Sequence, residues 1–400
     1  MQADVNNMGK YHLKTIILRS GERLPMLLTD SGVPLYGPTV FSVAEVRNRH
    51  RASNTIVNAL GALSVFQTFL DEHGIDLLAR LDEGSLLELG EIEGLVRTCR
   101  MDLSASSPQK ALVTSQVCAS RLRTICKYIE WTVKGKLLER EYRHSQLLQQ
   151  RGKIAVDTIR ARIPPATAQL DAREGLAPET VQRVMDIVRP DSPENPWRTE
   201  HARVRNHLIW ILLYQLGIRG GEFLGIRNQH INFRKGTLMI MRQADSIDDP
   251  RPRQPNAKTL ARELALSEQL QKQVSDYILH YRRKLKNASK HDFLLVSESG
   301  SPLSYAALNK VFAVLRQKHP ELPRNLTGHV LRHTWNDVFS EYADGHKIDE
   351  ESEKRIRAYQ MGWKPTSNSA AIYTRRTVRK KAQQVSLSLQ SVLVPEGNNS

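Results

Sequence analysis

The run from Leu208 to Tyr214 is apolar on every side of a helix, and Gly217 ends it shortly afterwards. A helix without a polar face is stable in a globular protein only when other elements cover it. The longest apolar stretch of the chain, Leu208 to Leu216, is roughly half the length that a membrane-spanning helix needs, and Gln215 interrupts it. We therefore expect a buried helix and no membrane span.

The net charge of the chain indicates what kind of molecule it binds. Its 400 residues include 58 Lys and Arg against 42 Asp and Glu, which gives a net charge of +16 and a pI of about 9.8. A chain of this length holds two or three domains with real cores. A globular protein this basic most often binds a polyanion, so we predict that its partner is nucleic acid.

The cysteines and the N-terminal residues indicate the cellular compartment in which the protein is expected. Cys99, Cys118 and Cys126 match neither a disulfide framework nor a metal-ligand spacing. They are predicted to be reduced, buried thiols, as in intracellular proteins. The stretch from Met1 to Lys10 is polar and lacks the apolar segment of a signal peptide. These features predict a cytoplasmic protein.

Apolar periodicity predicts a mainly α fold with a small β-sheet. Helices are expected from about residue 53, from 177, and at 83–99, 109–131, 139–162, 268–286, 304–317, 329–342 and 351–359. Strands are expected at 14–19, 24–29, 237–242 and 262–266. The proline-containing break at 163–173 predicts a linker between two domains.

The helix expected at 109–131 has two contrasting faces if it extends to residue 134. At about 100° per residue, its apolar side chains fall in one sector: Cys118, Leu122, Ile125 and Ile129. Its basic side chains fall on the opposite side: Arg123, Lys127 and Lys134. A basic stripe of this kind suits a helix that lies against a phosphate backbone. It also fits an ordinary solvated helix, and both interpretations stay open.

The stretch from Thr327 to Trp335 carries His329, Arg332 and His333. On a helix, the first two lie on one face. An imidazole beside a guanidinium suits a reaction at a phosphate, because one group moves protons and the other stabilises oxyanion charge. The run is also compatible with a solvated surface. A metal held by the two histidines is a third interpretation, but no glutamate stands between them as in the zinc-protease motif.

Two motifs lie upstream of this stretch. Arg219 stands in a glycine-rich bend after the buried helix, and Glu222 three residues later can hold a neighbouring side chain by a hydrogen bond. Lys258 leads into the second strand of the predicted pair. A lysine there is either a surface residue or an acid that protonates a leaving oxygen.

Downstream come Gly362-Trp363 and, ten residues later, Tyr373 with a basic run at 375–381. So many cations can offset the charge of a phenolate and make Tyr373 a nucleophile, although tyrosine is more often a packing residue.

Taken together, these motifs follow the order found in the tyrosine recombinases, also called the phage integrase family. The chain resembles that family over roughly residues 175–378. The resemblance implies that Tyr373 attacks a DNA phosphodiester, becomes joined to the 3′ phosphate and releases a 5′ hydroxyl. Arg219 and Arg332 would clamp the non-bridging oxygens, where charge develops. Lys258 would protonate the leaving oxygen, and His329 would assist proton transfer.

One motif departs from the usual family pattern, because Trp363 stands where a histidine is common. An indole N–H donates a hydrogen bond but cannot shuttle a proton, so Trp363 can support a phosphate oxygen or pack. Glu222 and His333 are expected to support the other groups. The resemblance implies no nucleotide, metal or other cofactor, because the bond energy is kept in the phosphotyrosine.

The resemblance also implies a biology and a domain plan. The expected protein is a site-specific DNA recombinase in integration, excision or movement of a mobile element. Its expected partners are double-stranded DNA, further copies in a homotetramer on paired sites, and accessory or partner recombinases where these are needed. The expected domains are an N-terminal segment with short β elements (1–45), a helical core-binding domain that binds DNA (46–165), a catalytic domain (174–382) and a tail (383–400).

Other functions stay open at this level. A type IB topoisomerase uses the same chemistry as a monomer, and a DNA-binding protein can keep a recombinase core without catalysis. The separate helical domain and the tail favour the recombinase. The tail has the spacing of a short amphipathic helix, which needs a surface to bury against: Val385, Leu389, Val392 and Leu393. That surface is either its own domain or a neighbouring subunit.

Overall fold

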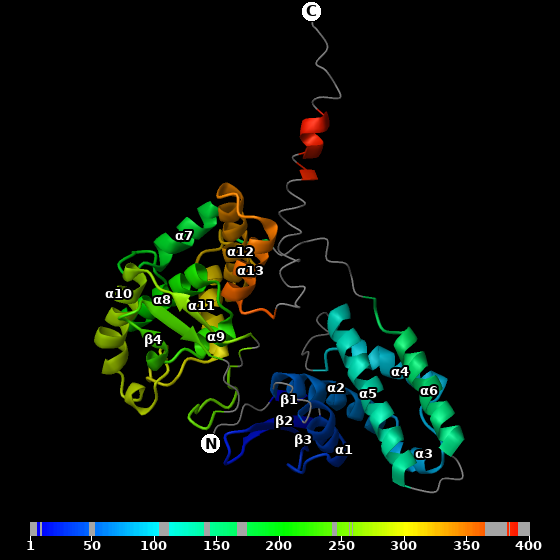
Figure 1. Ribbon diagram of the computed structural model, residues 1–400. Coiled ribbons are helices and arrows are strands. Elements are labelled where there is room, and N and C mark those ends of the chain that lie inside the picture. Colours follow the sequence, from blue (N-terminus) through cyan, green and yellow to red (C-terminus); the bar gives the residue numbers. More distant parts are fainter. Residues whose placement is uncertain are drawn as a thin grey trace, which may run out of the picture. The chain divides into compact units, whose positions relative to one another are not determined.

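The chain folds as two units, Met1–Ala168 and Gln169–Ser400, each with a hydrophobic core (Figure 1). The computed structural model describes residues 6–8, 10–47, 53–103, 112–139, 145–165, 174–241, 246–255, 257, 259–364, 382–383 and 385–390. Lys258, Tyr373, and most of the predicted linker and tail lie outside the described residues.

The first unit opens with a three-stranded antiparallel sheet in the order β1 (Asn6–Met8), β2 (Tyr11–Ile17) and β3 (Arg23–Thr29). Alternation along β2 and β3 buries Tyr11, Leu13 and Leu27 on one face. These side chains belong to the same core as the helices, so the sheet and the helices form one packed unit. The two strands predicted at 14–19 and 24–29 are confirmed, with the first beginning earlier, at Tyr11.

The helices of this unit follow in order: α1 (Tyr36–Phe41) with a π-helical turn (Ser42–Arg47), α2 (Ser53–Glu72), α3 (Leu77–Asp82), α4 (Leu89–Arg100), α5 (Ser115–Glu139) and α6 (Ser145–Ala161). The single helix predicted at 83–99 was wrong at its start. Asp76 caps α3 by accepting from the N–H groups of Leu78 and Ala79. Gly84, with φ of 73°, follows the end of α3, so α4 begins only at Leu89.

The second unit combines helices with another small sheet: α7 (Pro178–Val188), α8 (Glu200–Leu216), α9 (Gly220–Leu224), β4 (Ile231–Asn232), β5 (Thr237–Ile240), β6 (Arg262–Ala265), α10 (Glu268–Asp276), α11 (Tyr305–Lys318), α12 (Gly328–Gly345) and α13 (Glu350–Met361). Shorter helical turns lie at Asn228–His230, Tyr277–Tyr281, Arg282–Lys284 and Ala288–Lys290. The strands pair antiparallel in the order β4-β5-β6. The helix predicted at 268–286 is α-helical only to Asp276 and continues as π and 3-10 turns.

Helix α8 is buried at the centre of this unit, and its burial was predicted. The residues from Leu208 to Leu213 are each at most 2% exposed, and α7, α10 and α12 contact the helix (Figure 1). Gly217 ends it in the left-handed conformation with φ of 60°. No helix in the described part of the chain is both long enough and apolar enough to cross a membrane.

Candidate active site

The bend between α8 and α9 places Arg219 directly before α9. A Cβ on Gly217 would lie 2.7 Å from Trp335 Cγ and 2.9 Å from Met361 Cε, and its positive φ disfavours any other residue. The Arg219 side chain is half-buried. Its backbone N–H donates to Glu222 Oε2 at 2.8 Å, which ties the bend to the buried carboxylate that follows.

The carboxylate of Glu222 is fully buried and joins several segments. It accepts from both Nη atoms of Arg262 at 3.1 Å and from the hydroxyl of Thr259. Burial alone would raise the pKa of Glu222, but the hydrogen bonds and charge of Arg262, with those from Thr259 and the Arg219 N–H, outweigh it. Together they hold the pKa below its usual value, so Glu222 is ionised at neutral pH.

Arg332 points from α12 into the same cluster. The residue is 1% exposed, and its guanidinium donates to Gly217 O at 2.8 Å and to Met361 O at 3.0 Å. Nη1 also lies 3.9 Å from Glu222 Oε2. The bend before Arg219 and the end of α13 therefore fix the direction of this side chain.

His329 and His333 lie one turn apart on α12, with ring centroids 4.6 Å apart and planes at 83°. His329 is exposed and His333 is buried. An accessible imidazole thus lies three residues from the buried guanidinium of Arg332, on the helix that the sequence predicted. The part of the chain that the structure describes contains no group of three or more His, Cys, Asp or Glu side chains arranged to hold a metal.

The Gly362-Trp363 pair follows α13. Gly362 has φ of 63°, and its carbonyl accepts from the N–H of Leu260 at 2.9 Å. Trp363 is 7% exposed, and the Arg332 guanidinium carbon lies 5.7 Å from its ring centroid. This distance is within the range of a cation–π contact. Trp363 therefore packs on the guanidinium that the resemblance assigns to a phosphate.

Shared contacts bring four of the predicted site residues together: Arg219 through its backbone, Glu222, Arg332 and Trp363. The predicted nucleophile and the predicted acid for the leaving oxygen lie outside the described residues; they are Tyr373 and Lys258. Thr259, next to Lys258 in sequence, does reach the cluster through its bond to Glu222.

Thr259 and Arg262 are site residues that the sequence motifs did not predict. A signal for Arg262 is present in the sequence. It shares the two-residue period of Leu264 and Leu266, both buried, so a charged side chain stands in the inward register of a strand. A buried arginine needs a partner, and Glu222 provides it. Thr259 carries no comparable signal.

The basic stripe of α5 lies in the first unit. Helix α5 extends to Glu139, so Lys134 is inside it. Arg123, Lys127 and Lys134 are exposed, while the opposite apolar stripe is buried, as the periodicity predicted. At about 100° per residue, Glu130 falls beside the basic stripe. Arg160 of α6 pairs with Glu130 at 2.5 Å, which offsets this negative charge.

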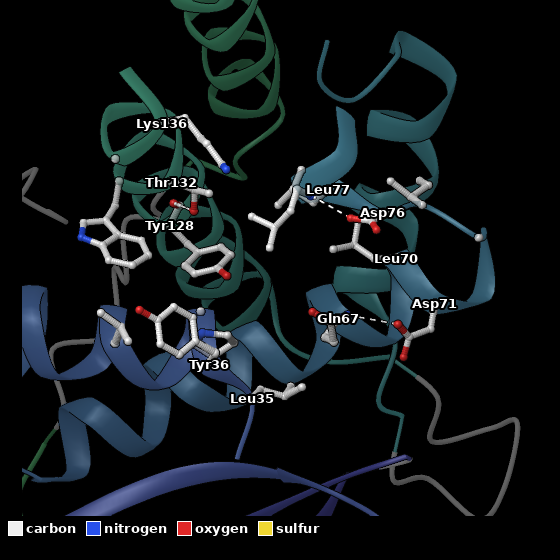
Figure 2. A pocket seen from close by; sticks show the side chains of 18 residues that line it. Leu35, Tyr36, Gln67, Leu70, Asp71, Asp76, Leu77, Tyr128, Thr132 and Lys136 are labelled. Atoms are coloured by element: carbon white, nitrogen blue, oxygen red, sulfur yellow. Dashed lines mark hydrogen bonds between the residues drawn. The ribbon is translucent and has the colours of Figure 1, made fainter. Parts of the chain in front are cut away.

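The first unit also contains a pocket of about 820 Å³, lined by Leu35 and by residues of α1, α2, α3, α5 and the α2–α3 connection (Figure 2). Its lining is largely apolar, with Leu77 and Tyr128 among the side chains. Lys136, which also lines the pocket, pairs with Asp82 at 3.1 Å. None of the predicted site residues is in its lining. The three cysteines are buried and free, as predicted, and burial raises the pKa of Cys99 to about 12 and that of Cys126 to about 11.

The fold and the site define a mainly α-helical protein of two units, with a buried Arg–Glu–Arg cluster in the second. The phage integrase family matches residues 174–380, just over half of the chain. The chain therefore belongs to the phage integrase family, and the resemblance drawn from its motifs is confirmed.

Individual relatives are distant. The tyrosine recombinase XerD of Halalkalibacterium halodurans is 24% identical over 192 residues, which cover 48% of this chain and 56% of XerD. The chain spans about half the length of the curated relatives that it matches.

Two solved structures are also similar. One is the Tn1549 transposon integrase in complex with circular intermediate DNA, at 13% identity and a TM-score of 0.45, covering 72% of this chain and 80% of that one. Another is the XerH site-specific recombinase bound to palindromic difH substrate, at 15% identity and a TM-score of 0.42, covering 80% and 88%.

Proposed function

We propose that the chain is a site-specific DNA recombinase that cuts and rejoins DNA through a 3′-phosphotyrosyl intermediate. The observation that carries this proposal is the buried cluster around Arg332. Its guanidinium is held by carbonyls from two distant segments and packs on Trp363. Such preorganised positive charge suits an oxyanion that forms during phosphoryl transfer. Membership of the family supplies the reaction class.

In the proposed reaction, the oxygen of Tyr373 attacks phosphorus and the bond to the 5′ oxygen breaks. Lys258 gives a proton to the leaving oxygen, and His329 assists proton transfer. Arg219 and Arg332 stabilise the charge on the non-bridging oxygens. Attack by a 5′ hydroxyl on the phosphotyrosine reverses these steps on another strand. One phosphodiester is exchanged for another bond of similar energy, so no nucleotide or metal is required.

The proposed partner is double-stranded DNA, bound by both units, with Arg123, Lys127 and Lys134 contacting phosphates. A homotetramer on paired sites would exchange strands, with accessory or partner recombinases where the site demands them. The proposed biology is integration, excision or movement of a mobile element. The domain limits given above and a cytoplasmic location are part of this proposal.

The test is a covalent-adduct assay on nicked duplexes drawn from the DNA that flanks the gene. Wild type should form an adduct, also in excess EDTA, whereas Tyr373→Phe should bind DNA and form none. Tyr359→Phe is the matched control, because Tyr359 is 60% exposed and donates to Glu263 O at 3.2 Å. It should form the adduct at the wild-type rate.

Each other outcome has a clear meaning. An adduct that persists in Tyr373→Phe and vanishes in Tyr359→Phe would move the nucleophile. DNA binding without any adduct in the wild type would point to a non-catalytic DNA-binding protein. Relaxation of supercoils by a monomer, without recombinant products from paired sites, would point to a topoisomerase.

A further inference from the structure

Arg262 is a buried arginine that lies outside the motifs of the resemblance. It opens β6 and is 4% exposed. Its Nη1 and Nη2 donate to Oε1 and Oε2 of Glu222, both at 3.1 Å, and its Nε donates to Gln360 O at 2.7 Å. One rigid planar group thus bonds to two distant segments at once, which the single ammonium of a lysine cannot reproduce.

These contacts bear on both arginines that the proposed reaction uses. Glu222 also accepts from the Arg219 N–H, and Gln360 directly precedes Met361, whose carbonyl accepts from Arg332. The packing around this junction is close, because a Cβ on Gly362 would lie 2.5 Å from Arg262 Nη1. A shift of the Arg262 guanidinium would therefore shift the supports of Arg219 and of Arg332 together.

Arg262 also decides which cation Glu222 neutralises. A bidentate arginine–carboxylate pair is stronger than a single contact. Arg262 binds both oxygens at 3.1 Å, whereas Arg332 Nη1 lies 3.9 Å from Oε2, beyond hydrogen-bond distance. Without Arg262, a buried carboxylate close to Arg332 would pair with it and reduce the positive charge that a phosphate meets.

We propose that Arg262 is a positioning residue of the recombination reaction. It binds Glu222 to the end of α13, so that Arg332 keeps both its direction and its charge for the DNA phosphate. This inference rests on the proposed function, because DNA cleavage is the reaction on which it acts.

The experiment measures single-turnover cleavage and non-covalent DNA affinity of the full chain. Arg262→Lys should cleave on the order of 10-fold more slowly and Arg262→Gln on the order of 10²-fold, with affinity nearly unchanged, as expected for lost preorganisation of charge. Thr259→Val removes one donor to the same carboxylate without altering a charge, and should slow cleavage about 10-fold. It remains a test if the arginine variants do not fold.

Arg282→Lys is the matched control for a loosened fold. Arg282 is 6% exposed and donates to the carbonyls of Ala288, His291 and Phe293, away from the Glu222 cluster. At a temperature where every variant is folded, it should cleave at the wild-type rate. Equal slowing in Arg282→Lys and Arg262→Lys, or wild-type cleavage by the Arg262 and Thr259 variants, would overturn the positioning role alone. A wild-type chain that forms no adduct would overturn the proposed function and this role with it.

Discussion

At the scale of single residues, the two arginines of the site lead to a prediction for DNA cleavage and, for Arg332, for stability. Arg219→Ala and Arg332→Ala should each slow DNA cleavage by on the order of 10²-fold or more, because each removes preorganised charge. Arg332→Ala should also destabilise the fold, by about 1–3 kcal/mol, since the buried carbonyls of Gly217 and Met361 lose a donor. Single-turnover cleavage and urea unfolding measure the two effects. Wild-type stability of Arg332→Ala would contradict the structural role of its two hydrogen bonds.

Glu222 gives a residue-scale prediction for acid stability. Its pKa is lower in the folded chain, so its contribution to stability is present above the unfolded pKa of about 4.3 and is lost as the pH falls through the folded value. The unfolding free energy of the wild type should therefore fall more steeply below about pH 4.3 than that of Glu222→Gln. Urea unfolding over this range checks it, with Glu263→Gln as the exposed control. Parallel pH profiles for wild type and Glu222→Gln would show that Glu222 is not held ionised.

At the scale of elements, the basic stripe of α5 leads to a binding prediction. Replacing Arg123, Lys127 or Lys134 by alanine should weaken binding to any duplex, because each lost phosphate contact also removes a released counterion. The slope of log affinity against log salt should decrease by roughly one for each contact. Lys153→Ala on α6 is the control for total charge, since this lysine is also exposed. The same loss in Lys153→Ala would show that net charge, not the α5 stripe, governs binding.

Elements also show where reading the sequence succeeds and where it does not. The unbroken apolar run located α8 because its residues are adjacent in sequence, and periodicity placed the two faces of α5. Periodicity did not predict the break between α3 and α4. The cap at Asp76 and the positive φ of Gly84 each depend on one residue, so they leave no periodic pattern. Turn chemistry of this kind is weaker than periodicity as a signal.

At the scale of the whole molecule, the sequence predicted several residues of the site but not the hydrogen bonds that connect them. The order of motifs identified the family, and the helical spacing placed His329 near Arg332. The partners of Arg332 are carbonyls of Gly217 and Met361, which lie 115 and 29 residues away in sequence. Only tertiary packing brings these carbonyls to Arg332, so no local sequence pattern predicts the two hydrogen bonds. The period of β6 marks Arg262 as facing inward, but its bonds to Glu222 and Gln360 depend on the same tertiary packing.

The tail leads to a prediction about assembly. Residues 385–390 are helical, and Val385, Leu387 and Leu389 are each more than half exposed. A helix this short gains its stability from a surface that covers its apolar side chains. If that surface belongs to a neighbouring copy, successive contacts of this kind between subunits can close into a ring. Deleting residues 383–400 should then leave single-site DNA binding nearly intact but weaken cooperative binding to a two-protomer site and recombination.

A gel-shift titration beside a recombination assay separates the ways in which the tail can act. Leu389→Ser is a milder variant of the deletion, because it changes one exposed apolar residue and keeps the length of the chain. It should reduce cooperativity in the same direction, since a polar side chain weakens apolar burial between copies. Unchanged cooperativity in both variants would show that the tail is dispensable for assembly. An equal loss of single-site binding and cooperativity would show that the tail docks on its own domain, where its removal damages the fold that binds DNA.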